Sequence, residues 1–395
     1  MSDLKHTRIE SIDLLRGIVM VIMALDHTRD YFHFGSMISD PTDMETTTPI
    51  LFFTRFITHF CAPVFVFLAG TSAYLSGQKK SRPELSRFLW TRGLWLIVLE
   101  IVLNNLIWWF DPLYHFINLQ VLWAIGLCMI IMAMLIRLPW KGLFIIGLLI
   151  LFGHNFLDRI QVEGYSPLAI LWYLTHQFQF LPISETRVIG FFYPFLPWLG
   201  IMILGYCLGS LYQKDFPASE RKPWLIRMGL GAIFAFGVIR AVNVYGDPVA
   251  WEVQRNAVYS LLSFINVTKY PPSLLFTLIT LGPALLLLVF SEKWKNRLTD
   301  FFLVYGRVPL FYYFLHVLFI HTGAILGLIL TGDDWRRMIL TPHQMFYSGD
   351  MTTYGYPLGI VYLIWIGVVL LCYPFCKKYM QYKAGNRDKW WLSYL

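Results

Sequence analysis

Long runs of apolar residues recur along this chain, and the short segments between them carry most of its charges. A helix that crosses a bilayer needs about 20 mostly apolar residues. The pattern therefore predicts an all-α, polytopic membrane helix bundle with about ten transmembrane helices, over residues 12–34, 50–77, 88–110, 117–136, 142–157, 191–212, 223–243, 271–290, 302–330 and 356–376. The fifth stretch is the weakest, because His154 and Asn155 interrupt it, and it is kept because the topology requires it.

The positions of Lys and Arg orient these spans, because cytoplasmic segments of membrane proteins carry an excess of positive charge. With ten spans and the N-terminus inside, the inner segments hold 21 Lys and Arg residues and the outer segments hold six. The first outer loop, residues 35–50, contains three carboxylates and neither Lys nor Arg. Both termini are therefore predicted to be cytoplasmic.

The composition agrees with a membrane protein, since 57% of the residues are hydrophobic and 14% are charged. The net charge of +8 is explained by the inner-side excess, which faces anionic lipid, so we expect membrane lipids as partners and no nucleic acid. The first apolar stretch contains Arg16 and has no small-residue cleavage site, so it is predicted to remain in the mature protein. No repeat or linker divides the chain, and residues 1–395 are interpreted as a single domain.

Five cysteines fall within the predicted spans, where small apolar packing is their ordinary role. Cys372 and Cys376 share a helix face, but that pair alone is a poor metal site, so no metal is predicted. Three outer segments, residues 167–180, 251–267 and 335–346, have apolar periodicity that is too short for a crossing. They are either helices at the membrane interface or ordinary connecting loops.

Ionisable residues inside a spanning helix are functional candidates, because burying them in the membrane is unfavourable. Arg16 and His27 in the first span are eleven residues apart, which is about three turns, so they project from nearly the same face about 16 Å apart. Asp13 is spaced to orient Arg16, and Asp30 or Tyr31 could fix the tautomer of His27 as a general base. The alternative is a structural ion pair at one helix end and an interfacial cluster at the other.

Two segments of the chain resemble a known family. They are the run Ser11 to Gly17 with Asp26 and His27, and the second-span sequence from Pro63 to Ser72. The family that they resemble is the catalytic domain family of heparan-alpha-glucosaminide N-acetyltransferase. The resemblance extends over most of the chain. The spacing of Arg16 and His27 is also similar to that in the first helix of the broader transmembrane acyltransferase superfamily. The resemblance implies transfer of an acyl group, most simply acetyl, from cytoplasmic acyl-coenzyme A to a sugar or another acceptor on the outer side.

The resemblance leaves two residues open as the catalytic histidine. His27 matches the superfamily histidine by its spacing from Arg16, whereas in the lysosomal enzyme an asparagine stands at that spacing and the assigned histidine lies farther on. His33 is the nearest match to that second position. The large lumenal region that precedes the first span of the lysosomal enzyme has no counterpart here, so a bacterial inner-membrane protein is expected.

Further polar residues inside the predicted spans could complete a site, each weighed against a purely structural network between helices. Candidates for contacting the acceptor or the oxyanion are Arg55, His59, Glu100, Asn104 and His316, and Arg307 could bind donor phosphates beside Arg16 and Asp13.

The sequence favours a membrane-embedded acyltransferase with acyl-coenzyme A as donor and an amine or hydroxyl acceptor, such as a glycan, on the outer side. The alternative is a multi-spanning transporter or flippase, but no correspondence between the two halves of the chain supports it. A homo-oligomer is compatible with either function.

Overall fold

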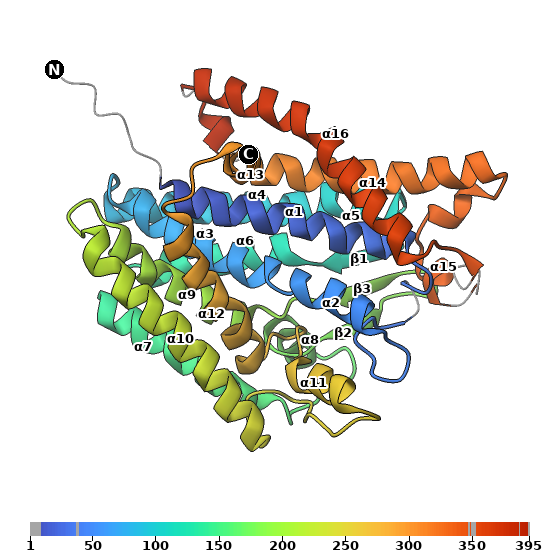
Figure 1. Ribbon diagram of the computed structural model, residues 1–395, viewed down its shortest axis with the longest axis horizontal. Coiled ribbons are helices and arrows are strands. Elements are labelled where there is room, and N and C mark those ends of the chain that lie inside the picture. The colour runs from blue at the N-terminus through green and yellow to red at the C-terminus, as the bar shows by residue number, and fades with distance from the viewer. Residues whose placement is uncertain (1–8, 37–38, 347, 349–352, 387, 394–395) are drawn as a thin grey trace.

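The computed structural model describes residues 9–36, 39–346, 348, 353–386 and 388–393, and these residues form mainly helices (Figure 1). The α-helices are α1 (Glu10–Phe32), α2 (Pro49–Thr58), α3 (Cys61–Gly77), α4 (Arg82–Val98), α5 (Asn105–Trp109), α6 (Val121–Leu135), α7 (Trp140–Gly153), α8 (Pro167–Thr175), α9 (Phe195–Leu208), α10 (Ala218–Val242), α11 (Ala257–Ile265), α12 (Leu274–Ser291), α13 (Arg297–Arg307), α14 (Pro309–Thr331), α15 (Pro342–Phe346) and α16 (Leu358–Gly385). The predicted helical fold class is confirmed.

Within the described residues, seven helical segments are long and apolar enough to cross a membrane, so the protein is an integral multi-pass membrane protein. They are Pro49–Gly77, Trp140–Leu157, Phe195–Tyr212, Ala218–Val242, Leu274–Ser291, Pro309–Thr331 and Leu358–Gly385. α1 has the length of a span but carries several charges, and the apolar helix α6 has only 15 residues. The count of ten spans and the orientation of the termini remain predictions.

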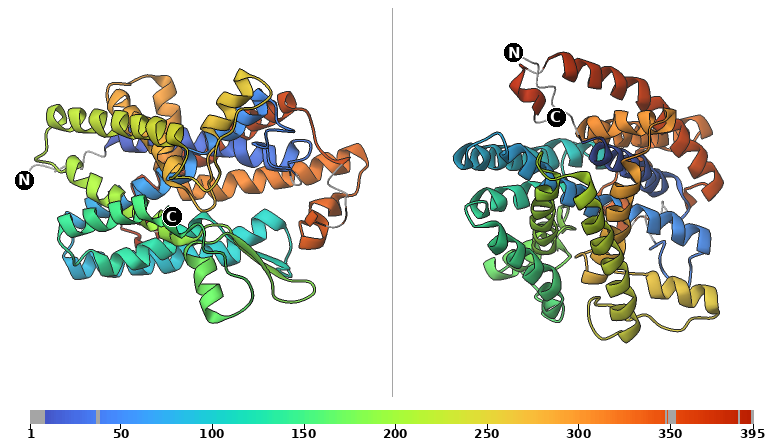
Figure 2. Two further views of the ribbon diagram at one scale, coloured as in Figure 1. Left: turned by 90° about the horizontal axis from the view of Figure 1, so that it is seen from below. Right: turned by 60° about the vertical axis from the view of Figure 1, so that its left-hand side comes forward.

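α1 is the central helix of the bundle and contacts α2, α3, α12, α13, α14 and α16. Most of its side chains are buried, and these include the charged residues Asp13, Asp26 and Arg29. The long helices α10 and α16 lie at the periphery (Figures 1 and 2), and their outward side chains are apolar, for example Phe234 and Leu363. Apolar side chains outside and charges inside are the arrangement that a lipid environment favours.

A small sheet was not predicted from the sequence. Its strands are β1 (Phe116–Leu119), β2 (Gln179–Pro182) and β3 (Val188–Phe191), in the order β1-β3-β2, with β1 parallel and β2 antiparallel to β3. The prediction that the fourth apolar stretch is helical from residue 117 is therefore wrong at its start. Residues 116–119 instead pair with a strand about 70 residues later, as the register Phe116 with Val188 shows, and such a long-range partner leaves no local signal.

Three predicted spans depart from a regular α-helix. The prediction of one helix over residues 302–330 is wrong, because the chain leaves helical geometry at Val308, whose φ is −134°, directly before Pro309. The second span has a turn at His59 and Phe60, between α2 and α3, but both residues keep right-handed helical backbone angles, so Pro49–Gly77 stays one span. The third contains a π-helical turn, Leu99–Asn104, between α4 and α5, and turns of this kind often occur at functional sites.

The three short outer segments contain helices, although their ranges are narrower than predicted. Residues 167–180 form α8 and then enter β2, residues 251–267 contain α11, and residues 335–346 form a 3-10 turn, Trp335–Met338, followed by α15. Ser166 and Asn256 cap α8 and α11 by accepting a backbone N–H in the first turn. Their placement at a membrane interface stays a prediction.

Candidate active site

Arg16 lies in a cluster near the beginning of α1 that the sequence had predicted. Its Nη1 donates to Asp13 Oδ1 at 2.9 Å and to the Gly306 carbonyl at 3.2 Å, and its Nη2 donates to Ser72 Oγ at 3.2 Å. The Arg307 side chain lies 4.0 Å from the second oxygen of Asp13. The structure therefore brings Asp13, Arg16 and Arg307 together, with two guanidinium groups sharing one carboxylate.

This cluster depends on a close crossing of α1 and α13. A Cβ added at Gly306 would lie 2.8 Å from the carbonyl carbon of Asp13 and closer still to its oxygen, and one added at Gly17 would collide with the Phe302 carbonyl. Only glycine allows backbones to approach this closely. The crossing places the Gly306 carbonyl and the Arg307 side chain beside Arg16.

A cavity of about 290 Å³ opens beside this cluster and follows α1 into the bundle. Its polar lining includes Arg16 and Arg307 together with Arg92 of α4 and Lys383 of α16. Its remaining walls are largely apolar and come from α1, α3, α4, α6 and α14, including Met20, Met23, Phe65, Leu122 and Tyr313. Arg92 and Lys383 were counted from the sequence only as charges that orient the spans, because nothing local to them indicates a shared cavity.

His27 lies deeper along α1, next to the inner end of this cavity. Its ring centroid is 6.1 Å from that of Tyr313, which lines the cavity, and 4.7 Å from that of Trp108. Its Nδ1 is 2.8 Å from Nε2 of His316, and His316 Nδ1 is 2.7 Å from the carbonyl oxygen of Tyr312. The histidine pair thus connects α1 to α14.

These contacts fix the tautomers of both neutral rings. The Tyr312 carbonyl can only accept, so His316 Nδ1 carries its proton and His316 Nε2 is an acceptor. His27 Nδ1 must then donate to His316, and His27 Nε2 keeps its lone pair. Among the residues that the structure describes, this is the single hydrogen bond that the half-buried His27 side chain makes. The His27 imidazole is thus held in position by a second imidazole.

The residues expected to orient His27 contact other groups, which corrects that part of the sequence interpretation. Asp30 accepts a hydrogen bond from Arg29 at 2.6 Å, and the Tyr31 hydroxyl donates to the Trp108 carbonyl at 2.5 Å. Residues at i+3 and i+4 on a helix are possible partners of a side chain, but the packing of the bundle decides which contacts form. The orienting group is His316.

His33 is not brought into the histidine pair. It caps the C-terminus of α1, where its backbone N–H donates to the Arg29 carbonyl and its backbone pairs with Tyr356. Of the two histidines, His27 is the one whose ring lies beside Tyr313 at the inner end of the cavity.

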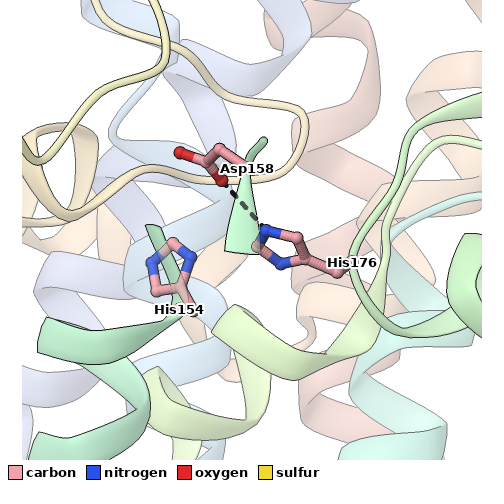
Figure 3. Close-up of side chains that lie close together, drawn as sticks. All are labelled: His154, Asp158 and His176. Carbon is pink, nitrogen blue, oxygen red and sulfur yellow. Dashed lines mark hydrogen bonds and ion pairs between the residues drawn. The ribbon is translucent and has the colours of Figure 1, made fainter. Parts of the chain in front are cut away.

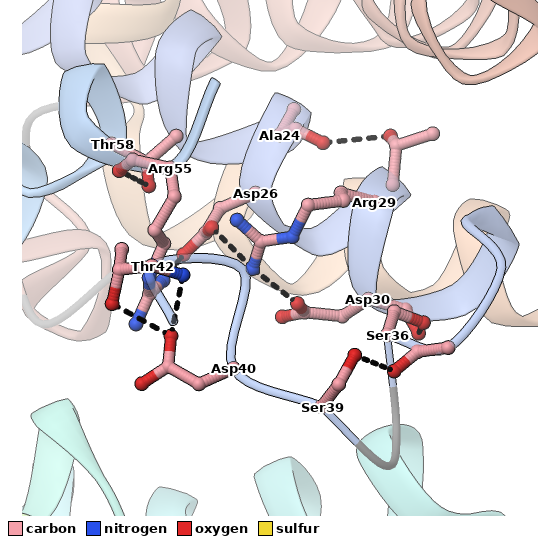
Figure 4. Close-up of polar contacts among 12 residues, drawn as sticks. Ala24, Asp26, Arg29, Asp30, Ser36, Ser39, Asp40, Thr42, Arg55 and Thr58 are labelled. Carbon is pink, nitrogen blue, oxygen red and sulfur yellow. Dashed lines mark hydrogen bonds and ion pairs between the residues drawn. The ribbon is translucent and has the colours of Figure 1, made fainter. Parts of the chain in front are cut away.

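A buried ionic network lies beyond His27 (Figure 4). Asp26 lies between two guanidinium groups, with Arg55 Nη1 2.5 Å from one carboxylate oxygen and Arg29 Nη2 2.8 Å from the other. Arg29 also contacts Asp30 at 2.6 Å. Arg55, predicted to contact the acceptor, is therefore partly neutralised by Asp26, and Arg29 is a member of this network that the sequence interpretation missed.

A second cavity, of about 330 Å³, opens on the far side of this network. Arg55 and His59 both line it, as their shared helix face predicted, together with Asp40, Lys269 and Tyr270. The His59 ring is buried against Phe276 at 5.4 Å, and its Nδ1 has no hydrogen-bond partner among the described residues. Burial would raise the pKa of the Tyr270 hydroxyl, but the charges of Lys269 and Arg55 outweigh that effect and lower it.

Glu100 and Asn104 pair as predicted but do not line either cavity described above. Asn104 donates to Glu100 Oε1 at 2.6 Å, and Glu100 Oε2 accepts the backbone N–H groups of Leu122 and Trp123 at 3.0 and 3.1 Å. Glu100 is fully buried at the N-terminus of α6, where a carboxylate is favoured by the helix dipole. This arrangement supports a structural role, and both residues are buried within the π-helical turn.

Comparison with known proteins places the first part of the chain in a defined family. Residues 8–239, more than half of the chain, match the family model described as heparan-alpha-glucosaminide N-acetyltransferase, catalytic. The match includes Asp13, Arg16, His27 and the α2–α3 segment, whereas His316 and Arg307 lie beyond it. A search of curated proteins found no match.

Proposed function

Because this chain belongs to the catalytic family of heparan-alpha-glucosaminide N-acetyltransferase, we propose that it transfers acetyl from acetyl-coenzyme A, bound in the Arg16 cavity, to an amine or hydroxyl acceptor, with His27 as base. Family membership implies a membrane acetyltransferase that uses acetyl-coenzyme A as donor. The observation that carries the residue assignments is the cavity along α1, which has cationic groups beside Arg16 and the histidine pair beside its inner end.

The donor fits this cavity by its chemistry. Coenzyme A has phosphates at one end and a long, weakly polar arm that ends in the thioester. Arg16, Arg307, Arg92 and Lys383 can bind the phosphates, and guanidinium groups do so with two parallel hydrogen bonds. The methionine- and aromatic-lined wall suits the arm, and about 16 Å of α1 separates Arg16 from His27. The positive-inside pattern favours entry from the cytoplasm.

The reaction needs one proton to be moved twice. The acceptor nitrogen or oxygen attacks the thioester carbonyl while His27 Nε2 takes its proton, which gives a tetrahedral intermediate with a negatively charged oxygen. The carbon–sulfur bond then breaks, the thiolate leaves, and the imidazolium returns the proton to the sulfur. His316 keeps His27 Nε2 unprotonated beforehand and accepts from Nδ1 throughout. Direct transfer is the simplest sequence that these residues allow.

The Arg55 and His59 cavity is the proposed acceptor site. It lies against the Asp26 network, and Asp26 is adjacent to His27 on α1, so an acceptor there approaches the thioester from the side opposite the donor. Its lining mixes Asp40, Lys269 and Tyr270, groups that bind hydroxyl-rich molecules such as sugars. We therefore propose a hexosamine or another small glycan as acceptor, on the outer side of a bacterial inner membrane.

The proposal is tested with the purified full-length chain in detergent, radiolabelled acetyl-coenzyme A and a panel of amino sugars and glycan hydroxyl acceptors. We expect acceptor-dependent transfer, with His27→Asn lowering kcat by about 100-fold to 10,000-fold. Arg16→Ala is expected to raise the KM for acetyl-coenzyme A by about tenfold or more, because charge-assisted hydrogen bonds to phosphate are lost.

Two matched controls separate chemistry from folding. His115→Gln changes a histidine in the loop before β1 that pairs with Asp111, and Arg227→Ala changes an arginine of α10 that lies over Trp224. Both variants should match the wild type. If the wild type neither binds acetyl-coenzyme A nor transfers acetyl to any acceptor, the donor assignment of the Arg16 cavity is refuted.

A further inference from the structure

A second histidine cluster lies at the connection between α7 and α8, on elements that do not carry His27 or Arg16. His154 and Asp158 follow the end of α7, in and after the short 3-10 turn His154–Leu157, and His176 caps the C-terminus of α8. One potential ligand atom from each side chain lies within 4.8 Å of the other two. Figure 3 shows the two imidazole rings and the carboxylate arranged around a common space.

The hydrogen bonding of this cluster is incomplete. The His154 side chain is buried, with a relative exposure of 2%, and neither of its ring nitrogens has a hydrogen-bond partner within the described parts of the chain. His176, 3% exposed, uses Nε2 for Asp158 Oδ1 at 2.9 Å, while its Nδ1 also lacks a described partner. Buried polar atoms are nearly always paired, so two imidazoles with three unpaired nitrogens require an explanation.

The carboxylate of the cluster is already held in position. Asn155 Nδ2 donates to Asp158 Oδ2 at 2.7 Å, and Asn155 Oδ1 accepts the backbone N–H of Leu274 at 2.9 Å, at the start of α12. Asp158 Oδ1 is thereby directed at His176. Side chains that bind metal ions in proteins are usually oriented in this way, by a hydrogen bond from a neighbouring group.

We propose that His154, Asp158 and His176 bind a divalent transition metal ion, zinc in the first instance. Two imidazoles and one carboxylate are a ligand set that zinc accepts, and calcium or magnesium would prefer oxygen ligands alone. Zinc bonds of about 2.1 Å hold tetrahedral ligand atoms roughly 3.4 Å apart, whereas the ligand atoms here lie within 4.8 Å of one another, so the longest edge has to contract by up to roughly 1.4 Å. The ion replaces the His176–Asp158 hydrogen bond and gives His154 a partner.

The proposed ion joins the end of α7 to the end of α8. Asp158 is partly exposed, so a water molecule can occupy the fourth coordination position. The Asn155 bridge extends this link to α12, which makes the metal a clip between three separate segments. This role is independent of the acetyl transfer proposed above.

The test measures metal content and stability of the full-length protein, purified in detergent with a tag that contains no histidine. After treatment with a chelator, the protein is titrated with Zn²⁺ and with Co²⁺. We expect one equivalent of Zn²⁺ per chain, a Co²⁺ absorption band in the visible region typical of four- or five-coordinate nitrogen and oxygen ligands, and a higher unfolding temperature with Zn²⁺ than with chelator.

Three variants locate the site, and one controls for histidine in general. His154→Gln, His176→Gln and Asp158→Asn should each lower the Zn²⁺ affinity at least tenfold and remove the stabilisation, while His115→Gln, which lies in a single histidine–aspartate pair, should bind as the wild type does. If a cluster variant fails to fold, the wild-type titration with and without chelator still decides. A wild type that binds no Zn²⁺ and unfolds at the same temperature in both, or cluster variants that bind like the wild type, would overturn the proposal.

Discussion

The close crossing of α1 and α13 gives the sharpest structural prediction. Replacing Gly306 by alanine adds one methyl group, which would lie 2.8 Å from the Asp13 carbonyl carbon and 2.9 Å from the Gly17 nitrogen. Ordinary contacts of a Cβ atom are 3.4–4 Å, and all the opposing atoms belong to backbone, so no side chain can rotate away. The Asp13 carbonyl oxygen would lie closer still, so the two helices must separate by more than about an ångström.

Forced separation of packed elements lowers the free energy of unfolding by about 1–3 kcal/mol. For Gly306→Ala we expect a fall in the unfolding temperature of roughly 1–4 °C, measured by tryptophan fluorescence in detergent. The separation also moves the Gly306 carbonyl, which accepts from Arg16 at 3.2 Å, and the adjacent Arg307. The KM for acetyl-coenzyme A should therefore rise severalfold, while kcat changes little because His27 and His316 lie deeper.

The matched control is Gly367→Ala in α16. A Cβ at this position meets no atom within 4 Å, so alanine should leave the stability unchanged or raise it slightly through its better helix propensity. The reasoning is refuted if Gly306→Ala is as stable as Gly367→Ala and binds acetyl-coenzyme A as the wild type does, since the crossing would then be looser than the structure indicates.

Three further perturbations test individual contacts. His316→Phe removes the acceptor that fixes the tautomer of His27, so kcat should fall about 100-fold at constant KM for acetyl-coenzyme A, and an unchanged kcat in steady-state assays would contradict the tautomer argument. Glu100→Gln should lower the free energy of unfolding by about 1–3 kcal/mol without changing the acceptor KM. An unchanged free energy of unfolding with a changed acceptor KM would show that Glu100 contacts the acceptor. Asp26→Asn and Arg55→Gln should be non-additive in unfolding experiments by about 0.5–3 kcal/mol, and additive effects would exclude a coupled ion pair.

Some of the side chains that the sequence grouped together do lie together in the structure. Arg16, Asp13 and Arg307 were expected to act together, and their side chains do meet. The relative depth of Arg16 and His27 was also foreseen, because both residues lie on one helix whose geometry is known. In contrast, the partner of His27 was assigned to its own helix, at Asp30 or Tyr31, although the contact comes from His316, which is 289 residues away.

The His154 cluster is a second example of contacts that the sequence could not predict. In the sequence, His154 and Asn155 were noted only as an interruption of an apolar stretch, and His176 was part of a short outer segment. Nothing local relates the two histidines. They face each other because α7, α8 and α12 pack together, and the unpaired ring nitrogens are visible only once that packing is known.

What the sequence determined by itself is the membrane class, the positions of most helices, and the shared helix of Arg16 and His27. These follow from apolar runs of fixed length and from the helical repeat, which are local properties. The tertiary structure alone decided the small sheet, the two cavities and the partner of each charged side chain. Each of these depends on contacts between residues far apart in the chain, and several helices could satisfy a buried charge equally well until packing selects one.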